Sequence, residues 1–147
     1  MEKRPPASPM KAPRGILFLC IRNSARSQLA EGLARAMALP DVRIWSAGTE
    51  PSGVHPMAVQ AMQEIGVDIK RQSSKHLMDV PWDDIDTVVT LCGEAAETCP
   101  AVGRGVRRVH WRLSDPALAP EAERLNAFRR TRDELRWRVA ALWPRDN

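Results

Sequence analysis

Long apolar runs are missing from this chain of 147 residues. The longest, GILFLCI, is far too short to cross a bilayer, which takes about 20 apolar residues. The first residues, rich in proline and charge, lack the apolar centre of a secretory signal and are typical of a loose tail. We therefore expect a cytoplasmic protein that has no membrane span.

Aromatic residues and excess charge are also scarce, with no tyrosine, two phenylalanines and a net charge of +4. The first 14 residues, with four basic side chains against one glutamate, carry +3 of that charge. The basic clusters RGVRRVHWR and RRTRDELRWR have no aromatic stacking pattern beside them, and the second alternates with acids as a solvated helix face does. The sequence therefore indicates no nucleic-acid partner.

Cysteines are few and odd in number: Cys20, Cys92 and Cys99. Three cysteines do not suit a purely structural set of disulfides in a reducing compartment. Zinc is disfavoured too, because no histidine stands at a customary short spacing to complete a site, so we expect no metal there. Reactive thiol chemistry is the better interpretation; the alternative is that Cys92 is a buried strand residue and Cys99 an incidental thiol.

Strand and helix patterns alternate along the chain. Apolar or alternating runs predict strands over 15–20, 42–48, 86–92 and 106–111, and periodic runs predict helices over 27–38, 55–66 and 121–143. This alternation predicts an α/β fold, a three-layer sandwich in which a four-stranded parallel sheet is flanked by helices. We expect a flexible tail over residues 1–14 and a single domain over residues 15–147.

Two cysteines fall at corresponding places in the predicted sheet. Cys20 ends the first strand, and Cys92 ends the strand over 86–92. Parallel α/β sheets place their ligands outside the carboxyl ends of the strands. Two thiols that are far apart in the sequence should therefore face the same crevice.

The loop between the first strand and the first helix is the candidate substrate-binding site. It comprises Cys20, Ile21, Arg22, Asn23, Ser24, Ala25, Arg26 and Ser27. Five residues separate Cys20 from Arg26, enough for backbone N–H groups to surround an oxyanion, and the helix that follows adds its positive end. Arg26 can offer its planar guanidinium group to two oxygens of a tetrahedral anion.

The same positive surroundings favour the reactive thiolate form of Cys20. Ser27 is placed to donate a hydroxyl hydrogen bond to that sulfur, and Asn23 can brace the loop by side-chain to backbone bonding. Taken alone, Cys-x5-Arg-Ser fits a buried cysteine and a surface arginine equally well. Its position between an apolar strand and a helix favours an anion-binding turn with a nucleophile.

Five segments resemble, in order, the landmarks of the low-molecular-weight tyrosine phosphatase family, and most closely its thioredoxin-coupled arsenate reductases. Between residues 15 and 143 they are CIRNSARSQLAEG, WSAGTEPSGVHPMAVQAMQEIGVD, VVTLCGEAAETCP, HWRLSDPA and FRRTRDEL. The resemblance implies reduction of arsenate to arsenite in arsenic detoxification, with thioredoxin as external reductant and no cofactor. One departure is Arg22, where many relatives have glycine; a positive φ there would strain the backbone.

The resemblance also implies roles for single residues. Cys20 attacks arsenate, Cys92 then attacks Cys20 and releases arsenite, and Cys99 attacks Cys92 to form a redox-active disulfide that thioredoxin reduces. Asp115 in SDPA is implied as the acid that protonates the departing oxygen, although an Asp-Pro pair is more commonly only a turn. Seven helical steps would separate the last two cysteines by about 10.5 Å, too far for a disulfide, so residues 92–99 must bend on oxidation.

Two other functions compete with this interpretation. A tyrosine phosphatase needs neither Cys92 nor Cys99, and the aromatic pair that usually follows its Asp-Pro is replaced by Ala117 and Leu118. An arsenite-binding sensor without turnover would need a DNA reader or a partner surface, and neither is evident. We therefore expect a monomeric arsenate reductase with arsenate as substrate and thioredoxin as partner.

Some relatives hold a potassium ion beneath the loop. The positions that match its ligands are Asn23, Glu31, Ser46, Ser73 and Lys75. An ammonium group at Lys75 would repel a cation and can itself supply the charge that supports the loop, unless Lys75 is simply a solvated lysine. We expect activity and stability that are indifferent to the exchange of potassium for sodium.

Overall fold

The strands of the chain form one parallel sheet. The structure is a computed structural model that describes residues 11–93 and 105–144. The strands are β1 (Gly15–Cys20), β2 (Arg43–Gly48), β3 (Thr87–Thr90) and β4 (Arg107–His110), in the order β2-β1-β3-β4. The predicted α/β fold with a four-stranded parallel sheet is confirmed, and each strand lies inside the range predicted for it.

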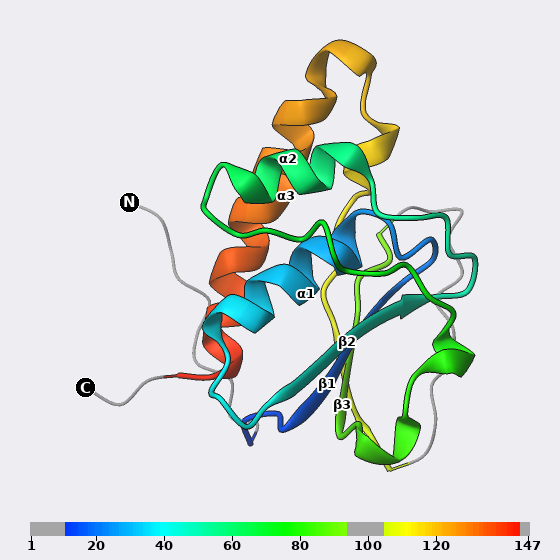
Figure 1. The fold of residues 1–147 in the computed structure, drawn as a ribbon, viewed down its shortest axis with the longest axis vertical. Coiled ribbons are helices and arrows are strands. Elements are labelled where there is room, and N and C mark those ends of the chain that lie inside the picture. Colours follow the sequence, from blue (N-terminus) through cyan, green and yellow to red (C-terminus); the bar gives the residue numbers. More distant parts are fainter. Residues whose placement is uncertain (1–10, 94–104, 145–147) are drawn as a thin grey trace.

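Helices lie between β1 and β2, between β2 and β3, and after β4 (Figure 1). They are α1 (Arg26–Met37), α2 (Pro56–Gln63), the short 3₁₀ helices η1 (Leu77–Asp79), η2 (Trp82–Asp84) and η3 (Pro116–Leu118), and the long α3 (Glu121–Leu142). The three predicted α-helices are therefore present. No helix among the described residues is long and apolar enough to cross a membrane.

β1 is the central element because it pairs with β2 on one side and β3 on the other. All six of its residues are buried, which explains its continuous apolar sequence. Its side chains alternate between two cores: Ile16 and Phe18 pack in the core of α1, α2 and α3, and Leu17 and Leu19 pack on the opposite face.

The two faces are covered differently. All three α-helices contribute to the larger core, with Leu29, Met62 and Phe128 among its fully buried members. Within the described residues, the smaller core on the other face is closed by the segment of η1 and η2, through Val80 and Ile85. The alternation of strands and helices along the sequence predicts a sheet covered by helices, but it does not predict which face of the sheet each helix covers.

Residues 11–14 lie against the domain. The carbonyl of Pro13 accepts a hydrogen bond of 2.9 Å from the indole nitrogen of Trp143, and the Asp86 carboxylate accepts one of 3.0 Å from the backbone N–H of Arg14. This part of the sequence that we assigned to the tail therefore contacts both the end of α3 and the start of β3.

Glu64, directly after α2, ties that helix to α3. Its carboxylate accepts hydrogen bonds of 2.6 Å from Arg129 and 2.8 Å from Arg132. Arg132 is buried and also donates to the carbonyl of Ala61 at 2.8 Å. These two guanidinium partners lower the pKa of Glu64 from 4.5 to about 2.

We expect Glu64→Gln to remove an acid-sensitive part of the stability. Because folding lowers the pKa of Glu64, its contribution is present above about pH 4.5 and is lost as the pH falls toward 2. Urea unfolding midpoints measured from about pH 7 to pH 3 should fall less steeply for the variant than for the wild type. Glu134→Gln breaks the exposed pair with Arg138 and is the matched control. Identical pH profiles for wild type and Glu64→Gln would contradict the prediction.

Candidate active site

Cys20 and Cys92 lie at the same edge of the sheet. Cys20 is the last residue of β1 and Cys92 follows β3, the strand beside it. The pairing continues past the strand, because the N–H of Leu91 donates to the carbonyl of Leu19 at 2.9 Å. The predicted placement at the carboxyl end of a strand is confirmed for Cys20, whereas Cys92 lies two residues beyond the end of β3. The structure adds that these two strands are neighbours in the sheet. Cys99 and the bend predicted over 92–99 lie outside the described residues from position 94 onward.

The loop after β1 is held from its outer side. The carbonyl oxygens of Ile21, Arg22 and Ser24 accept hydrogen bonds of 2.8–3.0 Å from backbone N–H groups in the segment 50–55. In a trans peptide unit the C=O and the following N–H point in opposite directions. Outward carbonyls therefore turn the N–H groups of the loop toward its centre, which is the arrangement that binds an oxyanion.

Asn23 takes the special backbone conformation in this loop. Among the described residues it is the one non-glycine residue with a positive φ, 46°. Asparagine tolerates the left-handed region better than most residues, so the glycine that relatives have at the position of Arg22 is not needed for a positive φ here. The side chain of Asn23 also accepts a 2.8 Å hydrogen bond from the N–H of Lys75, which confirms its predicted bracing role.

The sulfur of Cys20 has the predicted hydroxyl neighbour. Its Sγ lies 2.8 Å from the Oγ of Ser27, and that oxygen accepts a 2.8 Å hydrogen bond from the Nδ2 of Asn23. Since the serine oxygen already accepts a proton, its own hydroxyl proton is available to the sulfur. Cys20 itself is only 2% exposed, so this bond forms where water competes little.

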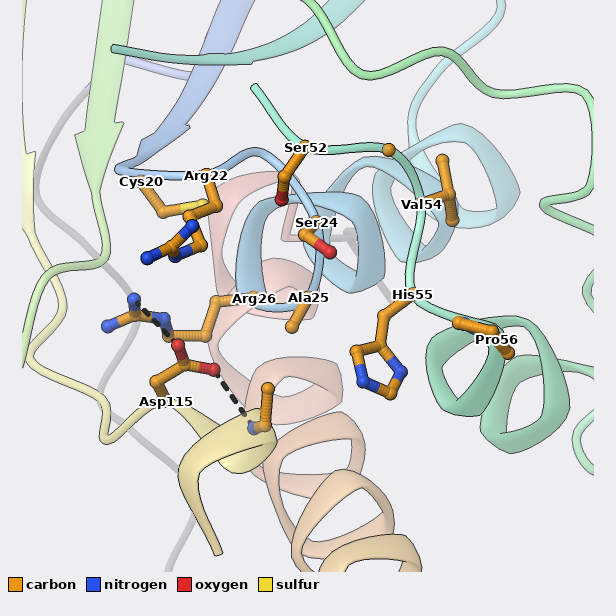
Figure 2. A pocket seen from close by; sticks show the side chains of 12 residues that line it. Cys20, Arg22, Ser24, Ala25, Arg26, Ser52, Val54, His55, Pro56 and Asp115 are labelled. Atoms are coloured by element: carbon orange, nitrogen blue, oxygen red, sulfur yellow. Dashed lines mark hydrogen bonds and ion pairs between the residues drawn. The ribbon is translucent and has the colours of Figure 1, made fainter. Parts of the chain in front are cut away.

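Arg26 connects the loop to the segments that carry Cys92 and Asp115. It is buried, and its Nη1 donates to the carbonyl of Leu91 at 3.1 Å and to the carbonyl of Leu113 at 3.0 Å. Its Nη2 lies 3.8 Å from the Oδ2 of Asp115. The guanidinium group that we predicted to bind an anion is thus held by the carbonyls of Leu91 and Leu113. Figure 2 shows it facing Asp115.

Asp115 serves as a turn residue and also reaches the cavity. Its Oδ1 accepts a hydrogen bond of 3.0 Å from the N–H of Ala117 and so caps η3. Its Oδ2 faces Arg26, and the side chain is 13% exposed. Asp115 therefore forms the turn that is common for an Asp-Pro pair, and its other carboxylate oxygen also lies at the cavity, where an acid would be needed.

A cavity of about 250 Å³ opens over the loop. Figure 2 shows Cys20, Arg22 and Arg26 on one side of it and His55 and Pro56 on the other. The exposed side chain of Arg22 adds a second guanidinium group at the edge of the cavity. Two arginines and a ring of N–H groups make this a site for a small, multiply charged anion.

His55 lines the cavity without any signal in the sequence that marked it as a site residue. Its Nδ1 accepts a hydrogen bond of 3.0 Å from the N–H of Met57, which caps α2, and its ring packs 4.7 Å from the ring of Phe128. Burial and the charge of Arg124 lower the pKa of His55, although Asp115 opposes the shift. Because Nδ1 accepts the hydrogen bond from Met57, it is the unprotonated nitrogen of the ring.

The residues beneath the loop do not fit a potassium ion. The Nζ of Lys75 donates to the carbonyls of Ser46 and Ser73 at 2.9 Å each and lies 3.9 Å from the Oε1 of Glu31. Burial lowers the pKa of Lys75, while Glu31 opposes this. The oxygens that would bind the ion already surround an ammonium group. Over residues 11–93 and 105–144, no group of three or more His, Cys, Asp or Glu side chains is arranged for a metal ion.

Comparison with known proteins finds similarity over nearly the whole chain. The family model described as low molecular weight phosphotyrosine protein phosphatase matches residues 15–145. An arsenate reductase of Halalkalibacterium halodurans is 46% identical over 126 residues, which are 84% of this chain and 91% of that protein. The solved structure of an arsenate reductase in an oxidized state has a TM-score of 0.75 at 35% identity, covering 88% of this chain and 95% of that one. A thioredoxin-dependent arsenate reductase of Corynebacterium glutamicum has a TM-score of 0.64 at 26% identity, covering 87% of this chain and 61% of that one.

Proposed function

The chain belongs to the low molecular weight phosphotyrosine protein phosphatase family, and we propose that it is an arsenate reductase that uses thioredoxin as its reductant in arsenic detoxification. The observation that carries the proposal is the placement of Cys20 and Cys92 at the ends of neighbouring strands. A phosphatase needs one thiol, an anion loop and an acid, whereas arsenate reduction takes two electrons from a pair of thiols. The similarity to arsenate reductases supports the same choice.

In the first step, the thiolate of Cys20 attacks the arsenic atom of an arsenate held in the loop. A sulfur–arsenic bond forms, the bond from arsenic to one of its hydroxyl groups breaks, and Asp115 gives its proton to that hydroxyl, which leaves as water. The inward N–H groups and the Arg26 guanidinium bind the remaining oxygens as their charge develops. Ser27, 2.8 Å from the sulfur, stabilises the thiolate before the attack.

In the second step, the thiolate of Cys92 attacks the sulfur of Cys20. The sulfur–arsenic bond breaks, its electron pair stays with arsenic, and arsenite leaves a Cys20–Cys92 disulfide behind. Cys99 then attacks Cys92, which releases the Cys20 thiolate and forms the Cys92–Cys99 disulfide that the dithiol of thioredoxin reduces. Arsenic gains two electrons, and two protein thiols lose them.

The states of Cys20 and Cys92 agree with the end of this exchange. Cys92 is disulfide-bonded, whereas Cys20 is a free thiol. A free thiol at Cys20 is what the exchange leaves once the Cys20 thiolate has been released. The same state leaves the anion loop beside Cys20 formed for the next substrate.

The proposal is tested by arsenate-dependent oxidation of NADPH in the presence of thioredoxin and thioredoxin reductase. We expect steady oxidation that requires arsenate, the protein and thioredoxin together. Hydrolysis of a tyrosine-phosphate analogue is measured in parallel, because the phosphatase alternative predicts this activity alone. Analogue hydrolysis without any arsenate-dependent oxidation would refute the proposal and favour the phosphatase.

We expect Asp115→Asn to slow the first chemical step by about 10²–10⁴-fold, since the departing oxygen loses its acid. Arsenate binding should be retained, because asparagine can still accept the hydrogen bond that caps η3. Single-turnover kinetics and calorimetric titration separate the two effects. Asp68→Asn is the matched control, because Asp68 also accepts from the N–H two residues on, that of Lys70, but is exposed. Unchanged single-turnover rates for Asp115→Asn would remove it from the mechanism.

We propose further that the enzyme acts as a cytoplasmic monomer without a bound cofactor. All groups that the proposed chemistry uses come from one chain: the loop, three thiols and one acid. The electrons come from a separate dithiol protein, so no resident redox group is required.

A further inference from the structure

A buried group of polar side chains lies beneath the anion-binding loop. Asn23, Ser27, Glu31 and Ser46 are at most 3% exposed, and hydrogen bonds of 2.5–2.9 Å link them. A buried carboxylate is costly unless nearby cations and hydrogen bonds compensate its charge. The groups that compensate Glu31 therefore also support the loop and Cys20 above it.

Two cations approach the carboxylate of Glu31. Arg35, one turn along α1, donates from Nε to Oε2 at 2.9 Å, but its side chain is 52% exposed. Lys75 is more enclosed, at 24% exposed, and its Nζ lies 3.9 Å from Oε1. With the carbonyls of Ser46 and Ser73 at 2.9 Å, three oxygens face the three hydrogens of this ammonium group.

The hydrogen bonds run in one direction toward Cys20. Glu31 accepts the hydroxyl proton of Ser46, so the oxygen of Ser46 accepts from the amide nitrogen of Asn23. The backbone N–H of Lys75 donates to the Oδ1 of Asn23 and so fixes which way that amide faces. The amide then donates its other proton to Ser27, whose own proton goes to the sulfur of Cys20.

We propose that Lys75 is a positioning residue whose ammonium group acts as a resident monovalent cation, which balances Glu31 and keeps this network directed at Cys20. Lys75 does not touch the substrate and acts through Glu31, Ser46 and Asn23. This inference rests on the proposed function only in that the reaction which Cys20 begins is taken to be arsenate reduction. The state of the cation site can be measured without arsenate.

Two substitutions separate the charge of Lys75 from the space that it fills. Lys75→Ala leaves an opening lined by the carbonyls of Ser46 and Ser73 and by Glu31, whereas Lys75→Met fills it with a neutral chain of similar length. In the fully reduced protein, iodoacetamide alkylation of the Cys20 peptide is followed by mass spectrometry at a fixed pH. We expect both variants to react on the order of tenfold more slowly than the wild type. Lys70→Ala, at an exposed lysine nearby in sequence, should react like the wild type.

Added cations provide the decisive measurement. Ammonium, methylammonium or potassium should restore the alkylation rate, the arsenate turnover and the melting temperature of Lys75→Ala, but not those of Lys75→Met. The wild type should behave identically in potassium, sodium and tetramethylammonium chloride at equal ionic strength. The melting temperature reports rescue even if Lys75→Ala is partly unfolded without a cation.

Any one of three results would overturn the inference. Lys75→Met could be alkylated at the wild-type rate, or none of these cations could restore the alkylation rate of Lys75→Ala. Potassium could also raise the alkylation rate, the turnover or the melting temperature of the wild type. Failure of this inference can be distinguished from failure of the proposed function. If cations restore the alkylation rate of Lys75→Ala but the wild type never reduces arsenate, the inference about Lys75 stands and the assignment as a reductase is wrong.

Discussion

Cys20→Ser should abolish arsenate reduction, with a loss of at least about 10³-fold in turnover. The serine hydroxyl in this position would keep the contact with Ser27 but would not be ionised near neutral pH, and it cannot form the disulfide that carries the electrons. Hydrolysis of a tyrosine-phosphate analogue should be lost as well, because both reactions begin with the same attack. NADPH oxidation and analogue hydrolysis measured on one preparation check this expectation.

Cys92→Ser and Cys99→Ser are the matched variants for this result. Each should lose multiple turnovers of arsenate yet hydrolyse the analogue like the wild type, since neither thiol is needed for attack by Cys20. Mass spectrometry after one arsenate turnover of the wild type should find the 92 and 99 thiols linked. Steady arsenate reduction by Cys92→Ser, or free 92 and 99 thiols after turnover, would refute the relay.

The sheet and the placement of its two thiols could be predicted because they depend on local patterns. β1 is apolar at nearly every position since both of its faces are buried, and Cys20 is its last residue. β3, with the sequence TVVT, is rich in β-branched residues and three of its four residues are buried, so the strand could be located to within two residues at its end without knowledge of any contact. Because parallel strands end at one edge of the sheet, Cys20 and Cys92 lie at that edge, and Cys20 lines the cavity over the loop.

The partners of the site's charged side chains could not be predicted in the same way. The Nη1 of Arg26 is bound to carbonyls 65 and 87 positions away, and Lys75 to a carbonyl 29 positions away. These contacts depend on how loops from different strands pack, which no periodicity encodes. His55 is a further example, because the sequence suggests a helix cap or a packing residue and only the tertiary structure places its ring at the cavity.

Gly48 is another residue whose role could not be predicted, because in the sequence it looks like an ordinary glycine at the end of a strand. It is the last residue of β2, and its N–H donates to the carbonyl of Lys75 at 2.9 Å. A Cβ atom at this position would lie 2.3 Å from the carbonyl oxygen of Ile21 and 2.9 Å from both the N of Asn23 and the carbonyl oxygen of Cys20. All three are backbone atoms of the anion-binding loop, so no flexible side chain can move aside.

Gly48→Ala should therefore reduce arsenate turnover by about 10²-fold, because the loop must shift and misplaces Cys20 and the anion-binding N–H groups. Overpacking against backbone should also cost about 1–3 kcal/mol of stability. Turnover and analogue hydrolysis, measured well below the melting temperature, should fall together, since both depend on the loop. Gly66→Ala is the control: Gly66 has open space around its Cβ position and a φ of +79°, so it should lose about 1–2 kcal/mol of stability and keep its activity. If Gly48→Ala is as active as Gly66→Ala, the close contact between Gly48 and the backbone of the anion-binding loop is not required for the active conformation of that loop.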